Sequence, residues 1–422
     1  MKPIEGVLAM RVEKIVLSVS CVVCLSLAGE VAAQCSVQVP GGTIPIVQNF
    51  ASGTQWTMSL GDTPCEGLLP LFANFRPRNG VSRSVLYRGS ISQIHVPYSP
   101  GSPRFRDVGI STAGLGANAI ALSPAECPGG TLYDGGKICV RVEDRGFAWK
   151  YGSSSARGQV LSIFMASQLG NYTYVNMWNF QDDGTIEVRT GLTGRLQIVD
   201  SGAAYLPYGS RLNPESDPTP AVGRNHQHNI YYRLDFDIGT SSDNAINNIS
   251  LQPSFDPSPT STCLSNGECF VTVENQLLNE TVDYISPGNF TSWRIFNKVI
   301  NNASGRNIGY ELVPSPRGLG YGMYDTSEPW ALGELWVTRY DPCHLLATDN
   351  HPPLISGACA GTADNVTQMV AGAGDINGQD IVVWYANRFS HFTRDEDQVN
   401  MPIEWLSFEV QPRSFNHRSP LE

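Results

Sequence analysis

The stretch Asn225-His-Gln-His-Asn-Ile-Tyr-Tyr-Arg-Leu-Asp-Phe-Asp237 is the clearest indication of how the chain folds. Its apolar and polar residues alternate, which is the pattern of a β-strand whose successive side chains point to opposite faces. His226 and His228 therefore project side by side from one face, as the ligands of a chelated metal ion must. Asp235 and Asp237 project from the other face. The strand predicts two separate metal-binding opportunities.

Length and charge limit the class of protein. The chain has 422 residues, enough for one large core or two to three domains. Its formal net charge is −11, and the absence of any run of lysine or arginine argues against a nucleic-acid partner.

The first residues are typical of a secretory signal. Basic residues precede the apolar run 15–27, and Val31-Ala32-Ala33 supplies small residues for cleavage near Gln34. We therefore expect residues 1–33 to be a signal peptide, with Met10 as an alternative start. The apolar run is short for a membrane span, and no later segment is a candidate. The mature protein is expected to be secreted, without a membrane span.

Cysteines and glycosylation sequons agree with export. Removal of the signal leaves eight of the ten cysteines, an even number that suits an oxidising compartment. Spacing does not fix their pairing, but the short separations favour Cys127–Cys139, Cys263–Cys269 and Cys343–Cys359, which leaves Cys35–Cys65. Sequons indicate a secreted eukaryotic glycoprotein and begin at Asn171, Asn248, Asn279, Asn289, Asn302 and Asn365.

Short alternating runs between glycines and prolines dominate the chain, and amphipathic helices are scarce. This pattern predicts an all-β fold, a large antiparallel β-sandwich in one domain. Proline-rich stretches at Asn213–Pro220 and Pro253–Thr262 are expected to be surface loops or arms. The expected strands are Ser84–Arg88, Ile138–Val142, Gln159–Met165, Tyr172–Phe180, Thr185–Thr190, Arg195–Val199, His228–Ile238, Glu334–Arg339 and Ile381–Tyr385.

Several further motifs occur in a fixed order. NYTYVNMWNF at 171–180 is followed by DGTIEVRTG at 183–191 and by Thr193-Gly194. The others are VLYRGSISQIHVPY (85–98), RDVG (106–109), Cys127…Cys139 with EDRG (143–146), LWVTRY (335–340), DIVVW (380–384), HFTRDED (391–397) and Met401-Pro402. Together they resemble the catalytic domain of copper amine oxidases. The resemblance implies that family's "supersandwich" fold for residues 71–422, preceded by a short N-terminal segment, residues 34–70.

The resemblance assigns a role to each matching residue. His226, His228 and His391 would bind copper, and imidazole nitrogens suit Cu(II). Tyr172, preceded by Asn171, would be the precursor of the topaquinone cofactor.

It also implies groups that act on the substrate and the cofactor. Asp107 matches the catalytic base, a role that requires a carboxylate with a pKa raised by burial. Tyr98 matches the tyrosine that hydrogen-bonds the quinone.

The resemblance implies a second metal site as well. Asp235, Asp237 and Asp380, with the backbone carbonyls of Phe236 and Ile381, match a site whose hard oxygen ligands suit Ca²⁺. This site would be structural.

The chain departs from the family beside the cofactor. Gln168 replaces a threonine, and Thr173 replaces an acidic residue. Thr173 also creates the sequon at Asn171, where a glycan would be incompatible with a buried cofactor. We therefore expect Asn171 to be unmodified in an active enzyme.

The leading hypothesis is a secreted, homodimeric oxidase. It would convert a small primary amine and dioxygen to aldehyde, ammonia and hydrogen peroxide, using Cu(II) and topaquinone. The alternative is a catalytically impaired, copper-binding secreted glycoprotein of the same fold, in which Tyr172 stays unmodified. A third interpretation is a calcium-stabilised adhesion protein.

Overall fold

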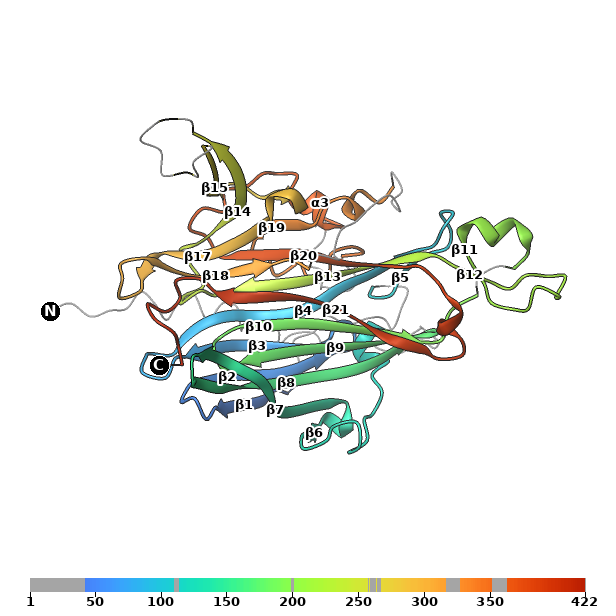
Figure 1. Ribbon diagram of the computed structural model, residues 1–422, viewed down its shortest axis with the longest axis horizontal. Helices are drawn as coiled ribbons and strands as arrows, with labels where there is room; N and C mark the ends of the chain where they lie inside the picture. Colours follow the sequence, from blue (N-terminus) through green and yellow to red (C-terminus); the bar gives the residue numbers. More distant parts are fainter. Residues whose placement is uncertain are drawn as a thin grey trace, which may run out of the picture.

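Two large antiparallel sheets face each other across one apolar core (Figure 1). The computed structural model describes residues 42–109, 114–198, 201–256, 258, 263, 267–315, 327–350 and 363–421. The predicted signal peptide lies outside these residues. The prediction of an antiparallel β-sandwich is confirmed.

The first sheet carries the histidine strand at its centre. Among the described residues it has nine strands, in the order β1-β2-β3-β4-β13-β20-β19-β16, with β5 paired to β4. Their bounds are β1 Ile44–Asn49, β2 Gln55–Thr63, β3 Gly67–Arg76, β4 Arg83–Pro97, β5 Arg104–Arg106, β13 His226–Phe236, β16 Thr281–Asp283, β19 Leu335–Arg339 and β20 Ile381–His391.

The second sheet carries the tyrosine strand. Its ten described strands follow the order β15-β14-β17-β18-β21-β10-β9-β8-β7-β6. Their bounds are β6 Thr131–Tyr133, β7 Ile138–Tyr151, β8 Ser154–Leu169, β9 Tyr172–Gln181, β10 Ile186–Gly194, β14 Asn244–Phe255, β15 Glu268–Leu277, β17 Ser292–Asn301, β18 Asn307–Val313 and β21 Met401–Pro412.

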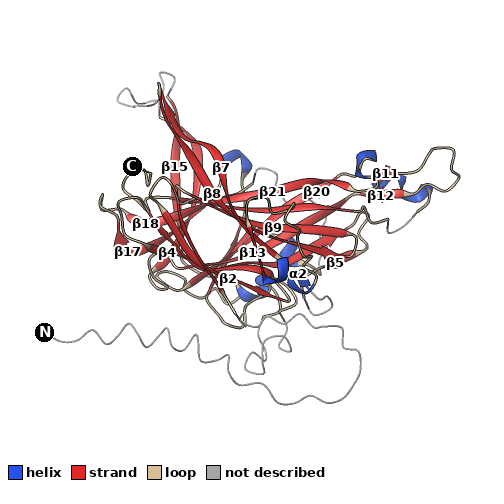
Figure 2. Cartoon of the chain, turned by 90° about the horizontal axis from the view of Figure 1, so that it is seen from below, coloured by secondary structure: helices blue, strands red, loops and turns tan. Residues whose placement is uncertain are grey.

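Helices are short and lie outside the sheets (Figure 2). The described α-helical turns are α2, Gly114–Ala117, and α3, Val366–Met369. The 3-10 turns are η1 Asp134–Gly136, η2 Ala203–Tyr208, η3 Pro287–Asn289, η4 Pro329–Ala331 and η7 Asp395–Asp397. No helix in the described part of the chain is long and apolar enough to cross a membrane.

Strand β13 is buried along its whole length. Its inward residues, such as Tyr232, pack in the core between the sheets, and Tyr232 is hydrogen-bonded to Thr190 of the facing sheet. Its outward face is also covered, because Tyr231 belongs to a second apolar cluster that includes Trp330 of η4 and Val366 of α3. Polar residues on both faces of β13 are therefore shielded from water, so they require partners or ligands.

Two sequence-based expectations differ from the structure. The predicted strand Arg195–Val199 is wrong for its described part, because β10 ends at Gly194, whose φ of +109° turns the chain out of the sheet. The predicted boundary at residue 70 falls inside β3, and β1 and β2 contribute Ile46 and Trp56 to the same core. Residues 42–70 therefore do not pack as a separate segment.

The described parts of the two proline-rich stretches lie in excursions from the body. Asn213–Pro220 connects β11 (Gly209–Arg211) to β12 (Val222–Arg224) at the right of Figure 1. Pro253 lies in the β14–β15 hairpin, which rises at the upper left. Both therefore extend away from the sandwich, as arms do.

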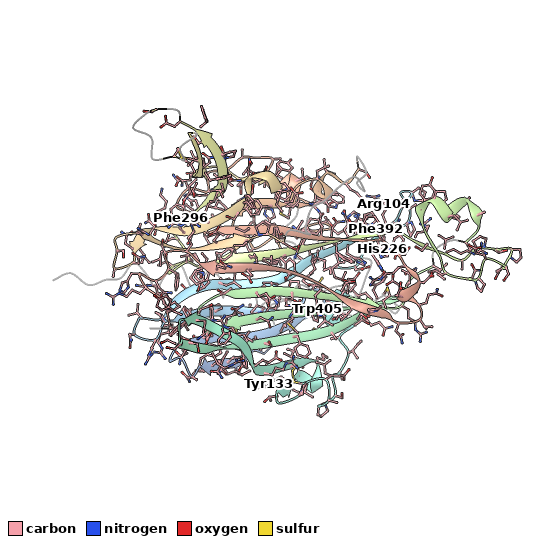
Figure 3. The ribbon with its side chains drawn as sticks, viewed as in Figure 1. Arg104, Tyr133, His226, Phe296, Phe392 and Trp405 are labelled. Carbon is pink, nitrogen blue, oxygen red and sulfur yellow. A yellow bond between two sulfur atoms is a disulfide. The ribbon has the colours of Figure 1, made fainter. Side chains whose placement is uncertain are left out.

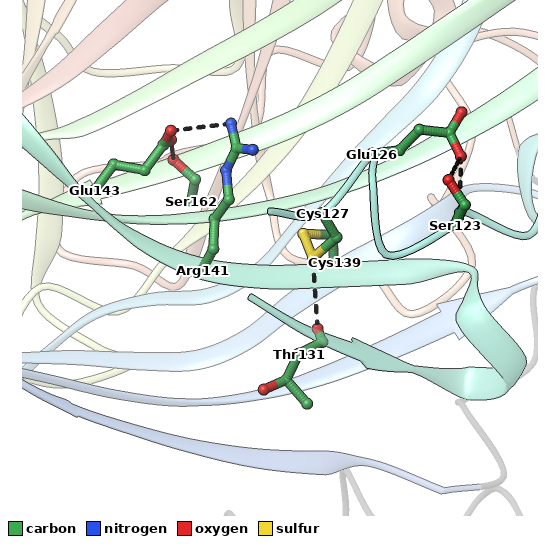
Figure 4. Close-up of a disulfide and its surroundings, with 8 residues drawn as sticks. All are labelled: Ser123, Glu126, Cys127, Thr131, Cys139, Arg141, Glu143 and Ser162. Carbon is green, nitrogen blue, oxygen red and sulfur yellow. Dashed lines mark hydrogen bonds and ion pairs between the residues drawn. A yellow bond between two sulfur atoms is a disulfide. The ribbon is translucent and has the colours of Figure 1, made fainter. Parts of the chain in front are cut away.

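Two predicted disulfides are confirmed. Cys127–Cys139 links the segment before β6 to β7 (Figure 4), and Cys263–Cys269 lies in the β14–β15 arm. Cys65 and Cys343 are also disulfide-bonded. Their predicted partners, Cys35 and Cys359, lie outside the described residues, so these two pairings stay predictions.

Candidate active site

The pairing of β13 with β20 brings three histidines together. His226 lies directly opposite His391, and His228 follows on the same face. All three rings are buried. The ring centroid of His226 lies 4.9 Å from the centroid of His228 and 4.8 Å from that of His391. Figure 3 shows His226 near Phe392, the neighbour of His391. Strands far apart in the sequence thus form one cluster, as predicted.

Hydrogen bonds determine which nitrogen of each outer histidine is available as a ligand. His226 Nδ1 lies 2.9 Å from the carbonyl oxygen of Arg224, which only accepts, so Nδ1–H donates and Nε2 keeps its lone pair. His391 Nε2 donates in the same way to the Asp397 carboxylate, at 2.9 Å, which leaves Nδ1 as acceptor. The two available nitrogens lie 3.3 Å apart.

The third histidine is oriented by a tyrosine. The Tyr174 hydroxyl donates to Asp107 Oδ2 at 3.1 Å, so its oxygen accepts from His228 Nδ1–H at 3.2 Å. The Nε2 atom of His228 is then left with a lone pair, and this buried atom has no hydrogen-bond partner. An orphaned buried nitrogen beside two others, with ligand atoms of all three residues within 4.8 Å, fits a bound transition metal.

His226 and His228 are neutral, as metal ligands must be. Burial, followed by the proximity of His391, lowers the pKa of His226 to about 3. Burial also holds the pKa of His228 well below its usual value. Both rings therefore present lone pairs at neutral pH.

Tyr172 reaches the histidines from the facing sheet. Its hydroxyl lies 2.7 Å from His226 Nε2 and 3.3 Å from His391 Nδ1, the two nitrogens available as ligands. Burial raises the pKa of this hydroxyl, so it stays protonated unless a metal ion replaces the proton. The tyrosine predicted as the cofactor precursor is thus within reach of the predicted metal.

Tyr98 and Asp107 complete the cluster. The Tyr98 ring stacks on His226 with centroids 4.3 Å apart, and its hydroxyl is hydrogen-bonded to Tyr172. Asp107 follows β5, and burial raises the pKa of its carboxyl to about 6 against the opposing hydrogen bond from Tyr174. The structure therefore brings together the three histidines predicted for copper, the predicted cofactor precursor Tyr172, and the predicted partners Tyr98 and Asp107.

A family model described as "Copper amine oxidase, enzyme domain" matches residues 46–421. The chain belongs to the copper amine oxidase family. It is 27% identical over 417 residues to a primary amine oxidase of Arthrobacter sp. (strain P1), covering 91% of this chain and 61% of that protein. Identity to histamine oxidase of Arthrobacter globiformis is 28%, over 91% of this chain and 58% of that one.

Solved structures show the same fold. The copper-containing benzylamine oxidase from Hansenula polymorpha aligns with a TM-score of 0.74 at 21% identity, covering 96% of this chain and 65% of that one. The Aspergillus nidulans amine oxidase aligns with a TM-score of 0.73. The chain spans about three fifths of the length of the curated relatives above.

Within this copper amine oxidase domain, the two departures from the family pattern are neighbours. Gln168 on β8 pairs directly with Thr173 on β9, and both flank the turn that contains Asn171. Asn171 is exposed, whereas Tyr172 is buried. Asn171 therefore does not lie with the buried histidine and tyrosine cluster, although it adjoins Tyr172 in sequence.

The predicted second-metal carboxylates also meet. Ligand oxygens of Asp235, Asp237 and Asp380 lie within 4.8 Å of one another, on the other face of the β13–β20 pair from the histidines. An Arg233 nitrogen lies 3.3 Å from Asp235 Oδ2, and both side chains are buried. Phe236 and Ile381, whose carbonyls were predicted as ligands, are register partners beside these carboxylates.

Sequence reasoning missed two residues of the copper amine oxidase site. Tyr174 follows Tyr172 by two positions, so strand alternation alone placed it on the same face. Asp397 ends the HFTRDED motif at 391–397, in which the family resemblance assigned a role to His391 alone. Burial alone would raise the pKa of Asp397, but the backbone N–H of Arg394 and the contact with His391 lower it, which keeps the carboxylate charged.

Asp397→Asn should weaken Cu(II) binding about 10- to 100-fold, because the substitution removes the charged acceptor that orients His391. Competition with a chelator of known affinity measures this change. Glu396→Gln is the matched control, since Glu396 is an exposed neighbour. Unchanged affinity in the Asp397 variant would show that His391 is not oriented in this way.

Proposed function

We propose that the chain is a secreted, copper- and topaquinone-dependent oxidase of primary amines. It would use dioxygen and release aldehyde, ammonia and hydrogen peroxide. The main support for this function is the position of the Tyr172 hydroxyl, which lies beside the available nitrogens of both His226 and His391. His226, His228 and His391 would hold copper, and a quinone derived from Tyr172 would supply the electrophile and accept electrons.

The chain's own groups support the remaining steps. Asp107, with its pKa near 6, is ionised at neutral pH yet basic enough to take a proton from the substrate carbon that bears nitrogen. The Tyr98 hydroxyl, which touches Tyr172, would hold the reacting oxygen by a hydrogen bond. Tyr174 keeps the Asp107 carboxylate oriented through its hydroxyl. Asn171, predicted beside the cofactor, is exposed and receives no role in these steps.

Purified protein loaded with Cu(II) in air should form a phenylhydrazine adduct on Tyr172, detected by absorbance and by the mass of its peptide. Tyr172→Phe should bind copper but form no adduct, because the precursor hydroxyl is missing. A copper-loaded protein whose Tyr172 stays unmodified would contradict the oxidase. Such a result would favour the alternative function, a copper-binding glycoprotein without turnover. The family departures Gln168 and Thr173 support this alternative.

Turnover should fall as the pH drops through about 6. Since the pKa of Asp107 is raised from 3.8 to about 6, its basic form is present above that pH and is lost below it. Asp107→Asn should reduce kcat by at least about 100-fold, within the range for loss of a general base, and should remove this acidic limb. A pH–rate profile of single turnover checks both, and an unchanged limb would show that another group is the base.

We also propose that Asp235, Asp237 and Asp380 bind calcium, with the carbonyls of Phe236 and Ile381. Three carboxylates beside one arginine leave about two negative charges, which suits a divalent cation with oxygen ligands.

Calcium at about 100 times its Kd should add about 2.7 kcal/mol to the free energy of unfolding. Denaturant titration measures this gain, which Asp380→Asn should reduce. No effect of calcium on the wild-type protein would contradict the site.

Homodimer formation, implied by the family, also stays a proposal. The β14–β15 arm presents the exposed side chains of Phe255 and Phe270, which a partner subunit would cover. A monomeric mass by light scattering would contradict it.

A further inference from the structure

The turn between β8 and β9 presents one side chain to solvent. Leu169 pairs with Tyr172, so Gly170 and Asn171 alone form the hairpin loop. Gly170 has a φ of +59°, which a two-residue hairpin turn requires at its first position. Asn171 is exposed, and the structure shows no hydrogen-bond partner for its side-chain amide. Its backbone is held, because its carbonyl accepts from the N–H of Arg195 at 2.8 Å.

This asparagine begins a sequon that exists only because of Thr173. Asn171-Tyr172-Thr173 has the acceptor pattern for N-linked glycosylation. An acidic residue at position 173, as in the family pattern, would abolish it. The replacement beside the cofactor tyrosine has therefore also created an acceptor at the tip of an exposed hairpin.

Three other sequons use their amides inside the structure. Asn365 is only 3% exposed, and its side chain caps α3 by accepting from the backbone of Thr367 and Gln368. Asn248 Nδ2 donates to Asp283 at 2.6 Å, and Asn302 Nδ2 donates to the carbonyl of Ser414 at 2.8 Å. In each, the attachment nitrogen or the side chain is directed into the protein.

The remaining two sequons, at Asn279 and Asn289, are intermediate between the exposed Asn171 and the three asparagines directed into the protein. Asn279 is exposed, but its amide donates to the Ala373 carbonyl at 3.0 Å. Asn289 is half-buried in η3. Among the described sequons, Asn171 combines an exposed side chain with an amide that has no hydrogen-bond partner.

We infer that Asn171 carries an N-linked glycan, one residue from the buried Tyr172. The inference rests on the proposed passage through the secretory route. The expectation of an unmodified Asn171 assumed that its surroundings were buried, whereas the strand directs Tyr172 inward and the turn leaves Asn171 outside. Carbohydrate on Asn171 therefore does not occupy the space of the cofactor.

The chemistry requires a glycosyl donor of the secretory route, a polyprenyl-diphosphate-linked oligosaccharide. A bond forms between Asn171 Nδ2 and the anomeric carbon of the sugar, and the bond from that carbon to the diphosphate breaks. The amide gives up one proton, and the diphosphate departs with the electron pair. No oxidation or reduction is involved.

The full chain, secreted from a eukaryotic host by its own leader or by a heterologous one, provides the test. Trypsin should release the peptide 158–189, which contains Asn171 and no other sequon. Peptide N-glycosidase should convert Asn171 to aspartate in this peptide, while the peptide with Asn365 should be unmodified. A secreted wild-type protein whose Asn171 is unmodified overturns the inference.

Two variants of one residue give a matched control. Thr173→Val removes the sequon with almost no change of shape and should abolish the glycopeptide, whereas Thr173→Ser keeps the sequon and should retain it. Glycan that persists on peptide 158–189 of the Thr173→Val protein would contradict Asn171 as the acceptor. In one further outcome, only the heterologous leader exports the chain, and Asn171 then carries a glycan. That result would confirm Asn171 as the acceptor but contradict the proposed secretion of the protein.

Discussion

The register of β13 against β20 is the constraint on which the rest of the site depends. It sets His226 opposite His391 at one end and Phe236 opposite Ile381 at the other. Because strand side chains alternate, a shift of one residue would move every ligand to the wrong face. The burial of both faces of β13 fixes the register, and it keeps the two polar clusters in dry surroundings where unpartnered groups are costly.

Protein partners then prepare each imidazole for a metal. Arg224, Asp397 and Tyr174 occupy the second nitrogen of the three rings, so the nitrogens left with lone pairs are His226 Nε2, His391 Nδ1 and His228 Nε2. Tyr174 serves twice, because its hydroxyl also donates to Asp107. The orientation of a metal ligand and that of the proposed base are thus linked through one oxygen atom.

Alternation in the sequence predicted β9, β13 and β20 and the common face of His226 and His228, because those features depend on local geometry. It did not reveal which strands pair, since β13 and β20 are distant in sequence and only the family resemblance joined His391 to the pair. Tyr174 and Asp397 were missed because they contact the ligands rather than match a ligand pattern. The domain boundary at residue 70 failed because the early strands complete the first sheet and share its core.

Anomalous X-ray diffraction at the copper absorption edge, from crystals grown with Cu(II), tests most directly whether the three histidines hold copper. We expect a strong peak bonded to His226 Nε2, His228 Nε2 and His391 Nδ1, about 2 Å from each nitrogen, the usual length of a metal–imidazole bond. We expect no copper peak at the carboxylates of Asp235, Asp237 and Asp380. A peak at the carboxylates alone, or none at the three histidines, would contradict copper binding by the histidines.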